Sequence, residues 1–205
     1  MYRRRNPGYS AGFSMTEVLI TLIIVMVGLL GIAGLQAKAQ VAELESYQRA
    51  QALIVLSDIV DRMNINREAT SCFAVTTDTT NGTPYIGTDG GAHLGTPTCA
   101  ASTTNYNNLA IAAINEIDNF LKGTSEALAG GESAGAMIGA RACISYDSTT
   151  ELAGKPDTGL YTVIVTWQGM SDLIAPSNMD CAVGEYGNEA MRRAVSTTVR
   201  FAQLQ

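Results

Sequence analysis

The pattern of apolar and polar residues separates an apolar N-terminal stretch from a longer mixed remainder. From Gly12 to Leu35 the chain reads GFSMTEVLITLIIVMVGLLGIAGL, and Glu17 is its only charged residue. As an α-helix, Phe13 to Leu35 would extend about 34 Å, which is enough to cross a bilayer. Its Leu, Ile and Val side chains favour insertion by roughly 4 to 7 kcal/mol, whereas a carboxylate at a helix centre costs about 3 kcal/mol. Membrane insertion is therefore favoured, and Glu17 requires an explanation.

The helical pattern continues beyond the apolar stretch. Leu53, Leu56, Val60 and Met63 repeat at intervals of three, four and three residues, which predicts an apolar stripe that packs on a domain. Glu45 and Arg49 have the spacing of a helical ion pair. We expect one helix from Phe13 to between Glu68 and Thr70, about 84 Å long, with a membrane half and an amphipathic half.

The middle of the chain predicts a loop followed by a short helix. Residues 71–99 are rich in Thr, Gly and Asp, and their Asn81-Gly82 pair would permit a hairpin. Helical spacing of Leu109, Ala113, Ile114, Ile117 and Leu121 predicts a helix over 109–121, and Gly123 is a natural stop.

Three strands are expected in the last third of the chain, over 141–147, 160–168 and 194–201. The second has the clearest alternation, with Tyr161, Val163, Val165 and Trp167 on one face. We expect an antiparallel sheet whose inner face covers the helix stripe, with Trp167 in the core. The predicted fold class is α+β, a long N-terminal helical spine packed against a small antiparallel sheet.

Composition and charge narrow the functions that the chain can have. The 205 residues suffice for an anchor and one modest domain. The net charge is −6, and without Arg3, Arg4 and Arg5 it would be −9. No basic patch is available to neutralise phosphates, so we expect no nucleic-acid partner.

The three arginines lie in a short segment, Met1 to Gly12, that is typical of a targeting leader. Basic residues before an apolar span place the N-terminus in the cytoplasm and the remainder on the other side of the membrane. Two alternatives are an ordinary signal peptide, cut after Ala37-Lys38-Ala39 and before Gln40, and an uncleaved anchor. The first is disfavoured because the apolar run is too long and the helical pattern continues through the cut.

The four cysteines, Cys72, Cys99, Cys143 and Cys181, all follow the apolar stretch. They form no CxxC pair, so a zinc site is not expected. An even number in an exported domain indicates two disulfides. Sequence-adjacent pairing, Cys72 with Cys99 and Cys143 with Cys181, is favoured, and Cys72 with Cys143 stays open. Each loop closure would contribute very roughly 3 to 4 kcal/mol.

Other motifs carry little chemistry. Residues 131–135, GESAG, match a nucleophile elbow, but no His follows them and an Ala-rich stretch precedes them. Asp78 and Asp89 do not have the spacing of an EF-hand loop. His93 is the only His and is expected on a surface loop. We therefore expect no catalytic residue, no metal site and no cofactor, and the chain is not expected to be an enzyme.

Gly12, Phe13 and Glu17, in GFSMTE before an unbroken apolar run, resemble the processing site of the type IV prepilin family. The resemblance implies that a prepilin peptidase cuts after Gly12 and that the new N-terminal Phe13 is methylated. The run Gly28 to Gln36, GLLGIAGLQ, and the strand that ends in Trp-Gln are similar to minor pilins of the pilus modification protein, or PilV, type. This match covers fewer residues.

The resemblance implies a chain with a leader at 1–12, a transmembrane and assembly helix at 13–35 and a periplasmic pilin-like domain at 36–205. It would enter the inner membrane and later join an extracellular pilus, in a tip or priming complex that helps to initiate assembly. The implied partners are other minor pilins, the major pilin, a tip adhesin, the inner-membrane assembly platform and the prepilin peptidase.

The chemistry of Glu17 gives this expectation a physical basis. A free Phe13 amine and Glu17 would be four residues apart on one helix face, or Glu17 could meet the amine of a neighbouring subunit and set the axial register. Gly28, Gly31 and Gly34 in the same helix indicate close helix packing, a stretch that unwinds locally on assembly, or ordinary tolerance of Gly in membrane helices.

Two alternative functions stay open. A pseudopilin of type II secretion or DNA uptake would carry the same N-terminal motif, although long loops and two disulfides favour the pilus. From another class, a membrane-tethered periplasmic binding protein or enzyme would leave the N-terminal site uncut and would need a convergent polar pocket, for which the sequence offers no candidate residues.

Overall fold

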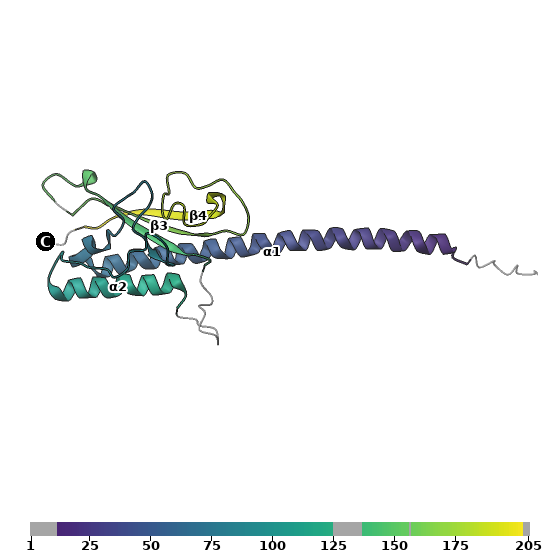
Figure 1. Cartoon of the computed structure of the whole chain (residues 1–205), viewed down its shortest axis with the longest axis horizontal. Helices are drawn as coiled ribbons and strands as arrows, with labels where there is room; N and C mark the ends of the chain where they lie inside the picture. Colours follow the sequence, from purple (N-terminus) through teal and green to yellow (C-terminus); the bar gives the residue numbers. More distant parts are fainter. Residues whose placement is uncertain (1–11, 125–136, 156, 203–205) are drawn as a thin grey trace, which may run out of the picture. The chain divides into compact units, whose positions relative to one another are not determined.

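The computed structural model describes residues 12–124, 137–155 and 157–202 (Figure 1). The chain divides into two compact units, residues 1–43 and 44–205, and each is described by itself. The elements, in chain order, are helix α1 (Met15–Ile65), 3-10 helix η1 (Arg67–Phe73), strand β1 (Ile86–Gly87), helix α2 (Thr104–Lys122), strand β2 (Arg141–Asp147), 3-10 helix η2 (Ser148–Thr150), strand β3 (Leu160–Gln168), 3-10 helix η3 (Glu189–Met191) and strand β4 (Arg192–Arg200).

In the first unit, the described residues form the beginning of α1. The unit's apolar side chains are all exposed, including those of Val18 to Leu35. Leu and Ile in this run are tolerated well in a helix, and no Pro interrupts it. A helix that is apolar on all sides and exposed on all sides needs an apolar environment from outside the chain.

In the second unit, one face of α1 enters the core through Ala52, Val55, Leu56, Ile59 and Met63. The predicted stripe was correct for Leu56 and Met63 and wrong for Leu53, which is 51% exposed. Ala52 packs in the core in place of Leu53. A small Ala allows the helix to approach its neighbours closely, a role that a search for large apolar residues does not detect.

Helix α1 ends at Ile65, before the expected end between Glu68 and Thr70. The chain continues as η1, in which Ala69 leaves helical geometry with φ −136°. The Arg62 carbonyl, near the helix end, accepts from both the amide and the side chain of Asn66, at 3.1 and 2.9 Å. The turn buries Ala69 and Phe73, which a straight helix would direct elsewhere.

The sheet has the order β1-β2-β3-β4, and all neighbouring strands are antiparallel. Strands β2 and β3 have the predicted bounds, whereas β4 begins two residues earlier and ends one residue earlier than expected. Strand β1 has only two residues, so it has no alternating pattern that a sequence could reveal. A long N-terminal helix packed against a small antiparallel sheet confirms the predicted α+β fold.

The main core lies between the inner face of the sheet and the helices. Tyr161, Val163, Val165 and Trp167 of β3 are all buried in it, as the alternation predicted. Helix α2 lies along the second part of α1 (Figure 1), and Arg62 of α1 pairs with Glu116 of α2. Ala110, Ala113, Ile114, Ile117 and Leu121 of α2 are buried.

The predicted helix over 109–121 is confirmed, and it is longer at its start. Gly123 ends it in the left-handed conformation, with φ 70°. Leu109 is exposed and Ala110 is buried instead, so the expected place of Leu109 in the stripe was wrong. The extra first turn is held by Asn107, whose side chain accepts from the Ser102 amide and donates to its carbonyl, both at 2.9 Å.

A second, smaller core covers part of the outer face of the sheet. It joins β2 and β3 to two long connections and contains Tyr85, Cys143, Ile164, Cys181, Ala182 and Tyr186. The Arg141 guanidinium lies 5.2 Å from the Tyr85 ring centroid and 5.0 Å from that of Tyr186, which are distances of cation–π contacts. The sequence pattern did not predict this second core.

Candidate functional site

The predicted processing residues lie immediately before α1. Gly12 and Phe13 are both exposed, and the Phe13 side chain is 84% accessible. A Cβ atom built on Gly12 would have no neighbour within 4 Å. Both residues of this peptide bond are therefore exposed among the described residues.

Helix α1 begins with a hydrogen-bonded cap. The Ser14 hydroxyl accepts from the Glu17 amide at 3.2 Å, and the Ser14 carbonyl accepts from the amides of Glu17 and Val18 at 3.1 and 3.3 Å. Ser14 and Glu17 thus have the Ser-x-x-Glu spacing of a capping box. A carboxylate in the first helical turn also stabilises the helix by about 0.3 to 1 kcal/mol through the helix dipole.

This capping role of Ser14 was missed by the sequence analysis, although the letters SMTE carry its signal. It changes what Glu17 can do. In the uncut chain the helix begins at Met15 and not at Phe13 as expected, so Phe13 and Glu17 do not share a helix face before cleavage. An ion pair between Glu17 and the amine of a neighbouring subunit does not require that face.

The apolar part of α1 is a candidate membrane span. It contains an 18-residue window with a mean hydropathy of 2.9, and none of that window is buried. The helix is unbroken at Gly28, Gly31 and Gly34, and Cβ atoms at these positions would have no neighbour within 4 Å. Packing among the described residues therefore does not account for the three glycines.

The structure joins Cys72 to Cys99 and Cys143 to Cys181, with Cα–Cα distances of 5.4 and 5.7 Å. The first disulfide ties η1 to the segment before α2. The second ties β2 to the connection between β3 and β4 and is buried in the smaller core. The two disulfides thus anchor the long connections that carry little regular structure.

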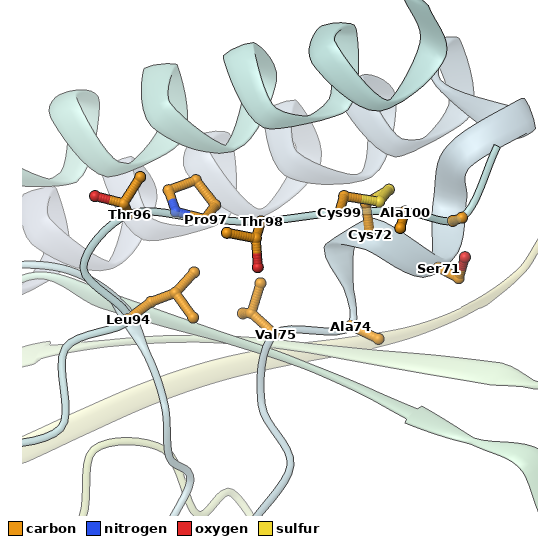
Figure 2. A pocket seen from close by; sticks show the side chains of 11 residues that line it. Ser71, Cys72, Ala74, Val75, Leu94, Thr96, Pro97, Thr98, Cys99 and Ala100 are labelled. Atoms are coloured by element: carbon orange, nitrogen blue, oxygen red, sulfur yellow. A yellow bond between two sulfur atoms is a disulfide. The ribbon is translucent and has the colours of Figure 1, made fainter. Parts of the chain in front are cut away.

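A hollow of about 480 Å³ adjoins the first disulfide. Figure 2 shows Leu94, Val75 and Thr98 directed toward one another beside Cys72 and Cys99. Its lining consists of Ser71, Cys72, Ala74, Val75, Leu94, Thr96, Pro97, Thr98, Cys99, Ala100 and Ala101. The lining contains no Asp, Glu, His, Lys or Arg side chain, and both of its cysteines are in the disulfide.

His93 is less exposed than expected of a surface loop residue. Its side chain is 13% exposed, and its Nε2 lies 2.8 Å from Asp118 Oδ1. The Gly95 amide donates to Nδ1 at 3.0 Å, so the proton of the neutral ring is on Nε2 and is donated to Asp118. A polar neighbour on α2 made this burial possible, and a loop sequence alone does not reveal such a neighbour.

Asp118 has two further donors, the Gly87 amide at 2.8 Å and the Lys122 ammonium at 2.9 Å. Burial acts to raise the pKa of Asp118, but the bonds from His93, Lys122 and Gly87 outweigh it and hold that pKa below its ordinary value. Among the described residues, no group of three or more His, Cys, Asp or Glu side chains is arranged to hold a metal ion.

Two other predicted features have simple outcomes. Asp78 accepts from the amides of Thr80 and Asn81, at 2.9 and 3.2 Å, and so forms part of a turn. The GESAG match at 131–135 lies outside the residues that the structure describes.

Glu45 does not pair with Arg49, as its spacing had suggested. Its Oε1 instead accepts from the amides of Met170 and Ser171, the Ser171 hydroxyl and the Arg193 guanidinium, at 2.9 to 3.2 Å. Burial acts to raise the pKa of Glu45, but these bonds outweigh it and lower that pKa. The long-range partners are more numerous than the single local one, and sequence spacing cannot reveal them.

No protein-family profile, no curated protein and no solved structure matches this chain. The function of this chain is therefore inferred from its own residues and their geometry.

Proposed function

We propose that this chain is a minor type IV pilus subunit of the PilV type, which helps to initiate pilus assembly in a tip or priming complex. One observation carries the proposal: an exposed Gly12–Phe13 bond precedes a capped helix with Glu17 in its first turn, and the apolar residues at the start of that helix are exposed among the described residues. A helix with these properties suits a subunit that is stored in a bilayer and later packed against other helices.

The first step is removal of the leader. A prepilin peptidase on the cytoplasmic side cuts after Gly12, and the new Phe13 amine is methylated. Phe13 and Ser14 lie before the first helical residue, Met15, so the scissile bond can enter an active site in an extended conformation without unwinding the helix. The inner membrane then holds the mature subunit, with its disulfide-bonded domain in the periplasm.

The second step transfers the apolar helix from lipid to the interior of a fibre. A carboxylate enclosed there without a partner would be strongly destabilising, whereas the amine of a neighbouring subunit would satisfy it. Glu17 can therefore select one axial stagger between subunits. Gly28, Gly31 and Gly34 present no side chain, so another helix backbone can approach this part of α1 closely.

The proposed partners are other minor pilins, the major pilin, the assembly platform and a tip adhesin. The domain would contribute through its disulfide-anchored connections, which bring sequence-distant loops to a defined conformation before any partner binds. Pre-ordering of this kind lowers the entropy that is lost on association.

A deletion strain tests the proposal. Loss of this chain should strongly reduce surface fibres, counted by electron microscopy, and leave the export of secreted enzymes at its normal level. Re-expression of the full chain should restore the fibres. Normal fibres together with lost secretion would contradict the pilus assignment and favour a pseudopilin of type II secretion.

A further inference from the structure

The connection after β3 displays large apolar side chains to solvent. In five residues it contains Met170, Leu173 and Ile174, which are 41%, 53% and 97% exposed. Ile174 is the most exposed large apolar residue among those described. Single exposed apolar residues are common on protein surfaces, but a cluster of three on one short segment indicates a contact.

The segment from Gly169 to Ile174 is held in place, so the display is not a loose loop. The Leu173 amide donates to the Ala190 carbonyl at 2.9 Å, and the Gly169 amide donates to the Met191 carbonyl at 2.8 Å. Glu45 Oε1 accepts from the amides of Met170 and Ser171, and Arg193 donates to the Ser171 carbonyl at 2.6 Å. Four consecutive or near-consecutive amides are thus already satisfied.

Satisfied backbone groups matter for the choice of partner. A segment enters a region poor in water more readily when part of its backbone is already paired, because lipid offers no hydrogen-bond partner. The one carboxylate of the segment, on Asp172, accepts from the Asn188 side chain at 3.2 Å, which lowers its demand for water. The segment therefore combines apolar tips with four amides, those of Gly169, Met170, Ser171 and Leu173, that already have acceptors.

The link to Glu45 brings the segment close to the start of the second unit, which begins at Leu44. Ten residues separate Glu45 from Leu35, where the apolar run ends. Whatever path these residues take, they cannot extend more than about 36 Å. A chain anchored through its apolar run therefore keeps the segment at a high effective concentration near the membrane surface.

We propose that Leu173 and Ile174 insert into the outer part of a lipid bilayer, at the boundary of headgroups and acyl chains, while the chain is anchored. Glu45 acts as the positioning residue that holds the segment for this contact. The inference rests on the membrane-anchored stage of the proposed function and does not depend on pilus assembly. Shallow insertion of a few apolar side chains is the usual depth for such interfacial contacts.

The full chain, reconstituted into phosphatidylcholine vesicles, provides the test. An environment-sensitive fluorophore is attached at Leu173→Cys and, as a matched control, at Leu152→Cys. Leu152 is also 53% exposed but lies in the connection between β2 and β3, at the other end of the antiparallel sheet. Mass spectrometry checks that both native disulfides are intact in each labelled protein, and Ile174→Cys is the second probe position if Leu173→Cys does not fold.

We expect blue-shifted emission at Leu173 and about twofold stronger quenching there by lipid-borne quenchers than at Leu152. Glu45→Ala should reduce that difference, since it removes the acceptor that holds the segment. Equal emission and quenching at both positions would overturn the proposal. The measurement is repeated with the chain reconstituted into nanodiscs of the same lipid at one copy per disc. A blue shift that disappears there would also overturn the proposal, because the contact would then be with a second copy of the chain.

Vesicle flotation separates this inference from the proposed function. A chain that floats with vesicles, but whose Leu173 probe behaves like the Leu152 probe, contradicts the lipid contact alone. A chain that does not float contradicts the membrane anchor as well.

Discussion

Glu17 has two roles in this account, and they operate at different stages. In the isolated chain it is the third residue of a capped first turn, where its amide bonds to Ser14 and its carboxylate complements the helix dipole. In an assembled fibre we propose that the same carboxylate meets the amine of a neighbour. Only the second role requires the charge to be enclosed.

Replacement of Glu17 separates these two roles. Glu17→Ala should leave leader removal intact but lower the amount of the chain in sheared fibres by at least about tenfold, the effect of about 1.4 kcal/mol. Immunoblots of membrane and fibre fractions measure both quantities. The matched control is Ser14→Ala, which removes the capping hydroxyl, weakens the helix by only about 1 kcal/mol and keeps the charge. Normal incorporation of Glu17→Ala would refute the register argument.

Asp118 provides a test of the domain at the same scale. Its pKa is lower in the folded state than in the unfolded chain, so its ionised form adds stability above the unfolded value, about 3.9. That stability is lost as the pH falls through the folded-state pKa. Asp118→Asn should therefore lower the free energy of unfolding by about 1 to 3 kcal/mol at pH 7, and the difference from wild type should shrink below about pH 4.

Urea denaturation between pH 2 and 7, followed by the fluorescence of the sole tryptophan, Trp167, measures this difference. Asp61→Asn, at an exposed position of α1, is the control and should have little effect at any pH. A pH-independent difference for Asp118→Asn would show that the charge of Asp118 is not the source of its contribution.

Helices and strands differed in how well their sequence patterns located them. Strands β2 and β3 were predicted with their observed bounds because each has alternating residues between clear turn signals. In both helices the first position of the apolar stripe was wrong, since Ala52 and Ala110 are buried where Leu53 and Leu109 had been expected, whereas most of the later positions were correct. Hydrophobic scales give Ala little weight, but close helix packing favours its small side chain.

The orientation of α1, that is, which of its faces is buried, can be tested with two of its isoleucines. Ile59 is fully buried, whereas Ile54 is 57% exposed. Ile59→Ala should lower the free energy of unfolding by about 2 to 5 kcal/mol, because it leaves a cavity in the core. Ile54→Ala should change it by no more than about 0.5 kcal/mol. Similar losses for the two variants, measured by the same urea denaturation, would contradict the observed orientation of the helix.

Features that depend on long-range neighbours could not be predicted. The sequence suggested Arg49 as the partner of Glu45, but its four donors come from residues 170–193. The side chain of His93 likewise contacts a carboxylate on α2 that is 25 residues away in sequence. The N-terminal motif, in contrast, is local, so Gly12, Phe13 and Glu17 could be singled out from the sequence alone.

At the scale of the whole molecule, three independent properties are consistent with one sequence of cellular locations for the protein. Three arginines precede the apolar run, the apolar run has no partner within its unit, and four cysteines in the second unit form two disulfides. Disulfides persist in oxidising compartments such as the periplasm. The proposed route, from cytoplasmic leader to membrane anchor to extracellular fibre, uses all three properties.

The mature N-terminus tests the central claim most directly. The protein is purified from membranes of the native cells, and its N-terminal peptide is identified by mass spectrometry. We predict that the chain begins at Phe13 and that its amine carries one added methyl group. A chain that begins at Met1 or at Gln40 would contradict the account, because the first is an uncleaved anchor and the second an ordinary secreted protein.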